Sequence, residues 1–395
     1  MRALPLYERD PYLAECRAEV VSSGDEDGRF FAVLSDTVLY PEGGGQPADR
    51  GFLDETPVVD VKRTGGVIRH FVGRPVAPGP VTVRLDWARR FDHMQQHTGQ
   101  HLLTAVAQDR FGWPTTAFHL GETVSDIELA VPRTGPERLR ALEEAVAGEI
   151  RAARPVTARH VSPEEFAALP VRTRGLPEGH AGSIRLVEIA GVDLNTCGGT
   201  HLRSTAEIEL IAFTGTEAIR GGVRLFFAAG GRARTRLAGH EERNAALRKL
   251  LGAPDEGLAA AVAERLERLK EAGRILRAKE EEEAEAKGLA LATGPARLVR
   301  ARFPGKGAAF LGLVSKSFQA AAREKVALLA SSDESGAYFL LAAGPDAPLD
   351  VQAAGREMAA LLGGKGGGSG RLFQGKGPSL DAFDSAFARL SQLAG

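Results

Sequence analysis

The stretch that decides the fold of this chain is FDHMQQHTGQHLLTAVAQDRF, residues 91–111. Its apolar and histidine side chains recur every three or four residues, which predicts an amphipathic helix. The helix is expected to end near Gly112 and Pro114, because glycine and proline stop helices. His97 and His101 stand four residues apart, so both imidazoles are expected on one face of the helix, one turn apart.

The residues before this helix are predicted to form a β domain. Residues 1–90 contain short runs of alternating apolar and polar side chains, separated by Gly and Pro, and this pattern predicts a small β-barrel domain. The segment YPEGGGQP, residues 40–47, is predicted to be a loop. The successive Gly43, Gly44 and Gly45 allow positive φ and a close approach of the backbone to a ligand, although an ordinary hairpin connection has the same signature.

The residues after the barrel predict an α+β fold class with three further parts. Strand and helix patterns alternate over residues 91–231, which predicts an α+β domain. Residues 232–293 are rich in Ala, Glu, Arg and Leu, and predict a helical linker, either one long helix or a helical hairpin. Residues 294–395 predict a compact α/β domain. Its segment 363–370, GGKGGGSG, is predicted to be a flexible loop.

Composition narrows the function classes. With 395 residues, 43% of them hydrophobic, the chain is long enough for two to four globular domains. Lys and Arg total 50 against 51 Asp and Glu, so there is no overall basic field and any nucleic-acid partner must bind at local patches. The two cysteines, Cys16 and Cys197, and the lack of a signal-peptide pattern or a long apolar run lead us to expect a cytoplasmic location.

A second motif supplies metal donors. Cys197 and His201 flank a short turn that contains two glycines, so both side chains can point at one centre. One thiolate and three imidazoles form a donor set typical of tetrahedral Zn²⁺, if the fold brings this turn to His97 and His101. Thr98 follows the first histidine where an HExxH peptidase has its glutamate, which disfavours proteolysis. Both a closed structural site and a catalytic site remain open at this point.

Four motifs in order carry a resemblance to a known family. They are GGGQ at 43–46, HTGQHLL at 97–103, CGGTH at 197–201 and the glycine-rich segment at 363–370. The first three resemble the editing domain of alanyl-tRNA synthetase and its free-standing AlaX relatives, and the last resembles the C-terminal DHHA1 domain of the same synthetase. The chain is similar to the long form of AlaX, so we expect editing without aminoacylation.

The resemblance implies a zinc-dependent aminoacyl-tRNA deacylase that contributes to translation fidelity. Its reaction is hydrolysis of the ester in mischarged Ser-tRNA(Ala), with Gly-tRNA(Ala) as a second candidate substrate. The zinc ligands implied are His97, His101, Cys197 and His201. Thr116 is the best match to the threonine that recognises the serine hydroxyl, with Thr115 beside it, and Gln46 is a second catalytic candidate. The alternative is a non-catalytic tRNA-binding module with a structural zinc.

Substrate-binding residues are expected in two places. Near the editing site they are Gly43, Gly44, Gly45 and Arg185. In the C-terminal domain, the glycine-rich segment and its cations fit an RNA backbone, because residues 363–377 contain no acidic side chain. These cations are Lys365, Arg371 and Lys376. The expected partner is tRNA(Ala) carrying the wrong amino acid, and a homodimer through the helical linker or the C-terminal domain is a candidate assembly.

Overall fold

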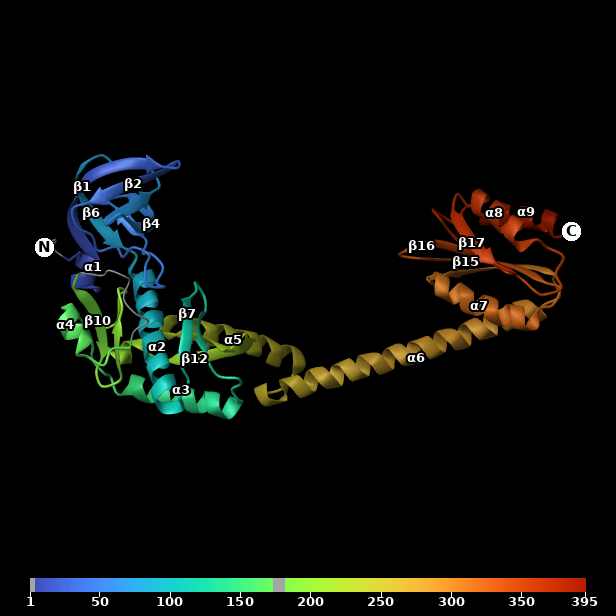
Figure 1. The fold of residues 1–395 in the computed structure, drawn as a ribbon. Coiled ribbons are helices and arrows are strands. Elements are labelled where there is room, and N and C mark those ends of the chain that lie inside the picture. The colour runs from blue at the N-terminus through green and yellow to red at the C-terminus, as the bar shows by residue number, and fades with distance from the viewer. Residues whose placement is uncertain (1–3, 173–181) are drawn as a thin grey trace. The chain divides into compact units, whose positions relative to one another are not determined.

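The computed structural model describes residues 4–172 and 182–395, and it shows a mixed α+β protein. The chain divides into two compact units, Met1–Ala246 and Leu247–Gly395 (Figure 1). Each unit buries apolar side chains of its own.

A closed six-stranded barrel forms the first part of the N-terminal unit, after the short helix α1 (Leu6–Arg9). Its strand order is β1-β2-β5-β4-β3-β6. The strands are β1 (Glu15–Glu26), β2 (Arg29–Leu34), β3 (Gly51–Leu53), β4 (Thr56–Thr64), β5 (Val67–Val72) and β6 (Gly79–Leu85). Inward side chains such as Val61 and Val83 are fully buried, which is the physical basis of the alternating sequence pattern. The predicted barrel is confirmed.

Helix α2 (Trp87–Phe111) follows the barrel and is buried over most of its length. The Asp86 side chain caps it by accepting a hydrogen bond from the backbone N–H of Arg89 at 3.1 Å. Gly112 ends it in the left-handed conformation, with φ 66°. Figure 1 shows α2 beside the sheet that contains β7 and β12. This long buried helix carries the predicted histidine pair.

Two antiparallel sheets and helix α3 surround α2. One sheet has the order β12-β13-β8-β7, and the other has the order β11-β10-β9. The elements are β7 (Thr115–Leu120), β8 (Ser125–Leu129), α3 (Pro136–Arg151), β9 (Val156–Val161), α4 (Pro163–Ala167), β10 (Ile184–Ile189), β11 (Asp193–Thr196), a 3-10 turn (Thr205–Ile208), β12 (Ile211–Ile219) and β13 (Gly222–Ala229). Apolar side chains from both sheets, α2 and α3 share one core.

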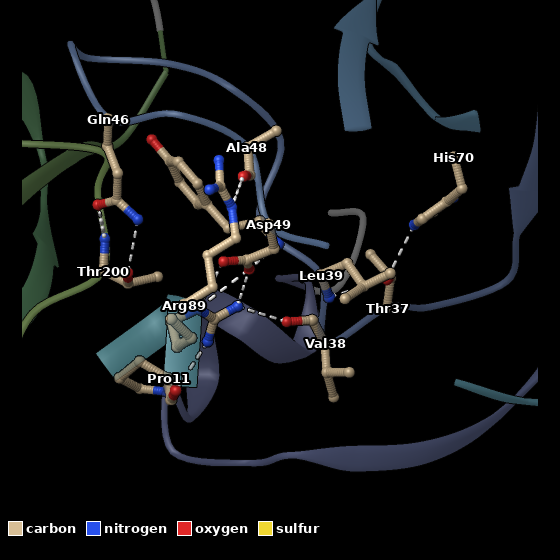
Figure 2. A network of polar contacts seen from close by, with 12 residues as sticks. Pro11, Thr37, Val38, Leu39, Gln46, Ala48, Asp49, His70, Arg89 and Thr200 are labelled. Carbon is tan, nitrogen blue, oxygen red and sulfur yellow. Dashed lines mark hydrogen bonds and ion pairs between the residues drawn. The ribbon is translucent and has the colours of Figure 1, made fainter. Parts of the chain in front are cut away.

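A buried ion pair joins α2 to the barrel. The Arg90 guanidinium and the Asp49 carboxylate are both fully buried and form an ion pair. The same guanidinium donates to the carbonyls of Pro11 and Val38 at 2.7 and 2.6 Å, partners that Figure 2 labels. Burial raises the pKa of Asp49 and the Arg90 charge opposes that rise. Removal of either partner would leave a buried charge unpaired and would destabilise the protein. The ion pair therefore fixes α2 against the barrel.

The predicted helical linker consists of two helices rather than one. Helix α5 (Gly230–Leu251) follows β13 directly, and α6 (Leu258–Thr293) begins after a short 3-10 turn (Asp255–Gly257). Gly252 adopts φ 67°, a left-handed conformation that favours glycine and ends α5. No helix in the described ranges is both long enough and apolar enough to cross a membrane.

The C-terminal unit is a five-stranded sheet covered on both faces by helices, in the order β14-β15-β16-β18-β17. Helices α6 and α7 pack on one face, and α8 and α9 pack on the other. The elements are β14 (Leu298–Pro304), α7 (Ala308–Ala321), β15 (Val326–Asp333), β16 (Gly336–Ala343), α8 (Val351–Leu361), β17 (Lys365–Ser369), β18 (Leu372–Gly377) and α9 (Phe383–Leu393). β14 and β15 are parallel, and the other neighbours are antiparallel.

The glycine-rich segment corrects the prediction of a flexible loop. Most of it forms strand β17, which pairs with β18 in a hairpin. A Cβ atom at Gly366 would lie 2.4 Å from the Gln374 carbonyl oxygen, and one at Gly368 would lie 2.0 Å from that of Leu372. These glycines therefore serve close packing of two strands, a cause that composition alone does not distinguish from flexibility.

Candidate metal centre

Four donors from two distant parts of the chain meet in the N-terminal unit. His97 and His101 come from α2, and Cys197 and His201 come from the turn that follows β11. Their ligand atoms all lie within 4.8 Å of one another. The Nε2 atoms of His97 and His201 lie 3.4 and 3.3 Å from the Cys197 Sγ. The three imidazoles are buried. The structure thus gathers the four residues that the sequence motifs predicted.

The orientation of His97 follows from its contact with Gln46. The Gln46 Oε1 accepts a hydrogen bond from the Thr200 backbone N–H at 3.0 Å, and its Nε2 donates to the Thr200 hydroxyl at 2.8 Å (Figure 2). The same Oε1 lies 2.9 Å from the His97 Nδ1. Because this oxygen can only accept, the His97 Nδ1 carries the proton. Its Nε2 therefore presents a lone pair to the cluster.

The other two imidazoles are held in the same manner. The Nδ1 of His101 lies 3.1 Å from the Asp193 carboxylate, and the Nδ1 of His201 lies 3.2 Å from the Thr98 hydroxyl. The Arg172 Nε lies 3.0 Å from the other oxygen of Asp193. A hydrogen bond at Nδ1 that leaves Nε2 free is the usual arrangement of a histidine that binds a metal.

The electrostatics of the cluster favour a cation. Burial opposes ionisation of the Cys197 thiol, yet the imidazoles of His97 and His201 hold its pKa well below its usual range. Burial also lowers the pKa of His101, but the Asp193 carboxylate and the Cys197 sulfur raise it to about 10. Cys197 and Asp193 thus supply negative charge at the centre. One thiolate and three imidazoles fit the donor preference of Zn²⁺.

The glycine before Thr200 is required by this geometry. A Cβ atom at Gly199 would lie 2.3 Å from the His97 Cε1 and 2.8 Å from the Gln46 Oε1. A side chain of any size would displace both residues. The second glycine of the CGGTH motif therefore lets the turn approach α2 closely enough for Cys197 and His201 to reach the cluster.

A cleft of about 780 Å³ opens onto three of the four donors, His97, His101 and Cys197. Gly44 and Gly45 line it from the barrel loop, and Thr115 and Phe118 line it from β7. A Cβ atom at Gly45, whose φ is +81°, would lie 2.6 Å from the Phe118 ring. The glycine loop is therefore one wall of this cleft. Gly43 bridges to Gln46 in the turn and does not line it.

The structure places Thr115, rather than Thr116, in this cleft. Thr116 is exposed, and its hydroxyl donates to the Glu128 carbonyl at 3.3 Å. The Thr115 hydroxyl is buried, and among the described residues it has no hydrogen-bond partner. The β7–β8 register shifts between Thr115 and Ala117, and at this irregularity Thr115 lines the cleft and Thr116 does not. The expectation that Thr116 contacts the substrate is corrected accordingly.

Two other predicted site residues hold the site instead of lining it. Gln46 is fully buried, does not line the cleft and orients His97, so it is a positioning residue rather than a catalytic one. The Arg185 guanidinium donates to the backbone carbonyls of Cys197 and Gly199 at 2.6 and 2.9 Å. Both bonds come from one nitrogen, Nη1, and through it Arg185 stabilises the ligand turn.

The three cations of the C-terminal unit that were predicted to bind RNA differ in the hydrogen bonds that they already make within the protein. Arg371 donates to the carbonyls of Gly344 and Leu349 at 2.7 and 3.0 Å, which ties together the segment before α8. The Lys376 Nζ donates to the Ser335 carbonyl at 2.6 Å. Lys365 is exposed, and within the described ranges it makes no such contact. Lys365 is thus the freest of the three for a phosphate contact.

Sequence reasoning missed several residues that support the centre. Thr98 and Thr200 lie inside the two ligand motifs, where their positions beside the ligands were a usable signal. Asp193 and Arg172 had no local signal, because they reach His101 only through the tertiary fold. A buried carboxylate near a metal-binding histidine can be found only when the structure brings the two together.

The chain is similar in sequence to a domain family of tRNA synthetases and to alanyl-tRNA editing proteins. Residues 184–226 match the family described as the threonyl and alanyl tRNA synthetase second additional domain. The chain is 37% identical to the alanyl-tRNA editing protein Aarsd1 of Mus musculus, over 98% of this chain and 97% of that protein. It is 36% identical to the rat protein, over 95% of this chain and 94% of that protein. It is also 36% identical to the alanyl-tRNA editing protein AlaX-L of Pyrococcus horikoshii, over 52% of each chain.

Proposed function

Because this chain belongs to the family of alanyl-tRNA editing proteins, we propose that it hydrolyses the ester between a wrong amino acid and tRNA(Ala). Ser-tRNA(Ala) is the main substrate in this proposal, and Gly-tRNA(Ala) is the second. The observation that carries the proposal is a cleft lined by His97, His101 and Cys197, three members of the cluster that His201 completes. A metal cluster that lines a cleft suits catalysis better than a closed structural site does.

The same proposal assigns Zn²⁺ to His97, His101, Cys197 and His201. When bound, the ion supplies Lewis acidity and a positive charge close to the reacting ester. The protein contributes fixed ligand orientation, because Gln46, Thr98 and Asp193 each contact the Nδ1 atom of one ligand histidine. Their hydrogen bonds keep the donors in place when the cleft fills.

Selection of serine follows from the side chain of Thr115. A site built for alanine cannot strongly reject the smaller glycine, and serine adds only one hydroxyl, so an editing step is needed. In the cleft, the Thr115 hydroxyl is buried without a partner in the described part of the chain. A serine hydroxyl can satisfy it, whereas the methyl group of alanine cannot. An unsatisfied buried hydroxyl costs about 1–3 kcal/mol, which favours the serine ester over the correct alanine ester.

The proposed partner is tRNA(Ala), and the C-terminal unit adds affinity for its backbone. The exposed Lys365 on the β17–β18 hairpin is the group that supports this assignment. Zinc chemistry is then the task of the N-terminal unit, and RNA affinity is shared between the two units.

The test is a deacylation assay with Ser-tRNA(Ala), Gly-tRNA(Ala) and Ala-tRNA(Ala) side by side, combined with elemental analysis. We expect one zinc per chain and release of serine well ahead of alanine. Cys197→Ala should lower the zinc content and abolish deacylation, because a methyl group cannot replace the thiolate. Cys16→Ala is the matched control, since the other cysteine of the chain lies on β1 of the barrel and outside the cluster.

Zinc binding without release of serine or glycine would contradict the proposed hydrolysis. The protein would then be a tRNA-binding module with a structural zinc. Absence of zinc, both in the purified protein and after refolding with zinc, would contradict the metal assignment.

A further inference from the structure

A second cleft lies at the first turns of α5, in the N-terminal unit, and its volume is about 910 Å³. Its lining is strongly charged and contains more cations than anions. The charged side chains that line it are Asp92, Glu122, Arg232, Arg234, Arg236 and Arg243. None of these six residues lines the metal cleft. The proposed hydrolysis therefore leaves this surface without a role.

Two of the four arginines form ion pairs with carboxylates of the same unit. Arg232 forms a bidentate ion pair with Asp92, with Nε–Oδ1 and Nη2–Oδ2 distances of 2.7 and 2.6 Å. Arg234 pairs with Glu209 at 2.7 Å. Arg236 and Arg243 are exposed, and among the described residues they make no ion pair or hydrogen bond. Two unpaired guanidinium groups then face a single unpaired carboxylate in this cleft, that of Glu122.

The two unpaired arginines lie on one face of α5. Steps of four, three and four residues separate Arg232, Arg236, Gly239 and Arg243, and this spacing places them in one stripe along the helix. The step of seven positions from Arg236 to Arg243 corresponds to about 10 Å along the axis. The Arg243 guanidinium lies over Gly239, where a Cβ would come within 3.2 Å of its Nη1. Two separated cations in an open cleft suit a chain of phosphates better than one small anion.

Two elements run from this cleft to the metal cleft. On α2, Asp92 lines the first cleft and His97 lines the second, about 7.5 Å further along the helix axis. On the sheet, Thr115 and Phe118 of β7 line the metal cleft, and Thr123 in the following turn lines the α5 cleft. Both clefts therefore adjoin α2 and the β7–β8 hairpin within the same unit.

We propose that the α5 cleft binds the phosphodiester backbone at the acceptor end of tRNA, while the aminoacylated 3′ end enters the metal cleft. Arg236 and Arg243 make the phosphate contacts. This inference rests on the proposed function for the identity of its ligand. The binding surface itself is tested separately, because it predicts salt-dependent RNA affinity whether or not the ester is hydrolysed.

The experiment compares the full-length protein with the double variant Arg236→Glu/Arg243→Glu. Binding to uncharged tRNA(Ala) is measured from low to high salt, and hydrolysis is measured for Ser-tRNA(Ala) and for a short 3′-terminal oligonucleotide that carries serine. We expect roughly tenfold weaker tRNA binding and a salt slope smaller by about two, since each lost phosphate contact removes about one unit. We expect unchanged zinc content and unchanged hydrolysis of the short substrate, which does not reach α5.

Two further variants complete the design. Arg236→Gln/Arg243→Gln should shift affinity in the same direction by a smaller amount, which separates loss of contact from repulsion. Arg133→Glu/Arg140→Glu is the matched control, because these exposed arginines of the same unit have no partner within the described ranges and line neither cleft. The inference is overturned if the double Glu variant retains both the tRNA affinity and the salt slope, or if the control weakens binding equally. Failure of wild-type protein to release serine from either substrate would instead contradict the proposed function.

Discussion

Gln46, Asp193 and Thr98 decide which nitrogen each ligand histidine presents. Each lies within hydrogen-bonding distance of one Nδ1 atom, at 2.9, 3.1 and 3.2 Å, and none is itself a predicted ligand. A histidine whose Nδ1 is held in this way has one free nitrogen with a fixed direction. The cluster is therefore pre-organised for a tetrahedral cation by residues around it as much as by the donors themselves.

Substitution of Thr115 tests whether its hydroxyl causes the preference for serine. Thr115→Val keeps the shape of the side chain and removes the group that is buried without a partner. We expect the preference for Ser-tRNA(Ala) over Ala-tRNA(Ala) to fall by about 1–3 kcal/mol. Thr116→Val is the neighbouring control and should leave the rate ratio unchanged. If Thr116→Val lowers the ratio of the Ser-tRNA(Ala) rate to the Ala-tRNA(Ala) rate and Thr115→Val does not, Thr116 and not Thr115 selects serine.

His70 predicts a pH dependence of the barrel's stability. Its Nδ1 donates to the Ala32 carbonyl at 3.2 Å, and its Nε2 accepts from the Thr37 hydroxyl at 2.9 Å (Figure 2). Burial lowers the pKa of His70 to about 4. The unfolded chain therefore takes up a proton near pH 6.5 while the folded one does not, and stability is lost as the pH falls from about 6.5 to 4.

The expected size is about 2 kcal/mol of unfolding free energy lost between pH 7.5 and pH 5. His70→Gln has no titrating group and should lack this part of the decrease. Urea unfolding of both proteins at the two pH values measures the difference. Equal decreases in the two proteins would show that His70 does not cause the pH dependence.

Among the elements, α6 contains two glycines with opposite roles. A Cβ at Gly288 would lie 2.5 Å from the Val314 carbonyl oxygen and 2.8 Å from the Ser317 Cβ, so this glycine lets α6 pack closely on α7. A Cβ at Gly273 would have no atom within 4 Å. One helix thus combines a packed end with an exposed middle, where the charged pair Glu271–Arg274 lies.

The two Gly→Ala substitutions should therefore differ in sign. Gly288→Ala forces α6 and α7 apart, and we expect it to lower the unfolding free energy by about 1–3 kcal/mol. Gly273→Ala should raise it by about 0.5–1 kcal/mol, because alanine is the better helix former. Urea midpoints, with hydrogen exchange of the α7 amides, measure both effects. Destabilisation by Gly273→Ala would show that this position is packed against something in solution.

At the scale of the whole molecule, the two compact units predict a separable division of labour. The boundary lies within α5, at Ala246 and Leu247, and both clefts belong to the N-terminal unit. A chain that ends after Gly252 keeps α5 intact and retains every metal donor. We expect this fragment to bind zinc and to deacylate the short aminoacyl oligonucleotide at the rate of the full chain.

The same fragment should bind tRNA(Ala) less tightly than the full chain, because it lacks the β17–β18 hairpin and Lys365. A binding titration at several salt concentrations measures this difference, and Lys365→Glu in the full chain should account for about one unit of salt slope. Equal affinities for the fragment and the full chain would remove the C-terminal unit from tRNA binding. Loss of zinc from the fragment would contradict an independent N-terminal unit.

Local patterns in the sequence were sufficient for the barrel, for α2 and for each of the two donor pairs, whereas the meeting of the two pairs was implied only by the family resemblance. The four-residue spacing of His97 and His101 follows from helix geometry, and the CGGTH turn follows from the small volume of glycine. Such features depend on neighbouring residues alone, so they can be predicted before the tertiary structure is known.

The tertiary structure alone decided which side chains face the cleft and which are used inside the protein. The packing of β7, at a shift in its register with β8, placed Thr115 in the cleft and Thr116 outside it, and close strand pairing made the glycine-rich segment a hairpin. Arg185 and Arg371 were predicted to bind substrate, but the Arg371 guanidinium and the Arg185 Nη1 donate to backbone carbonyls. These outcomes depend on partners far along the chain, because burial and hydrogen bonding are set by the packing of distant segments and not by local periodicity.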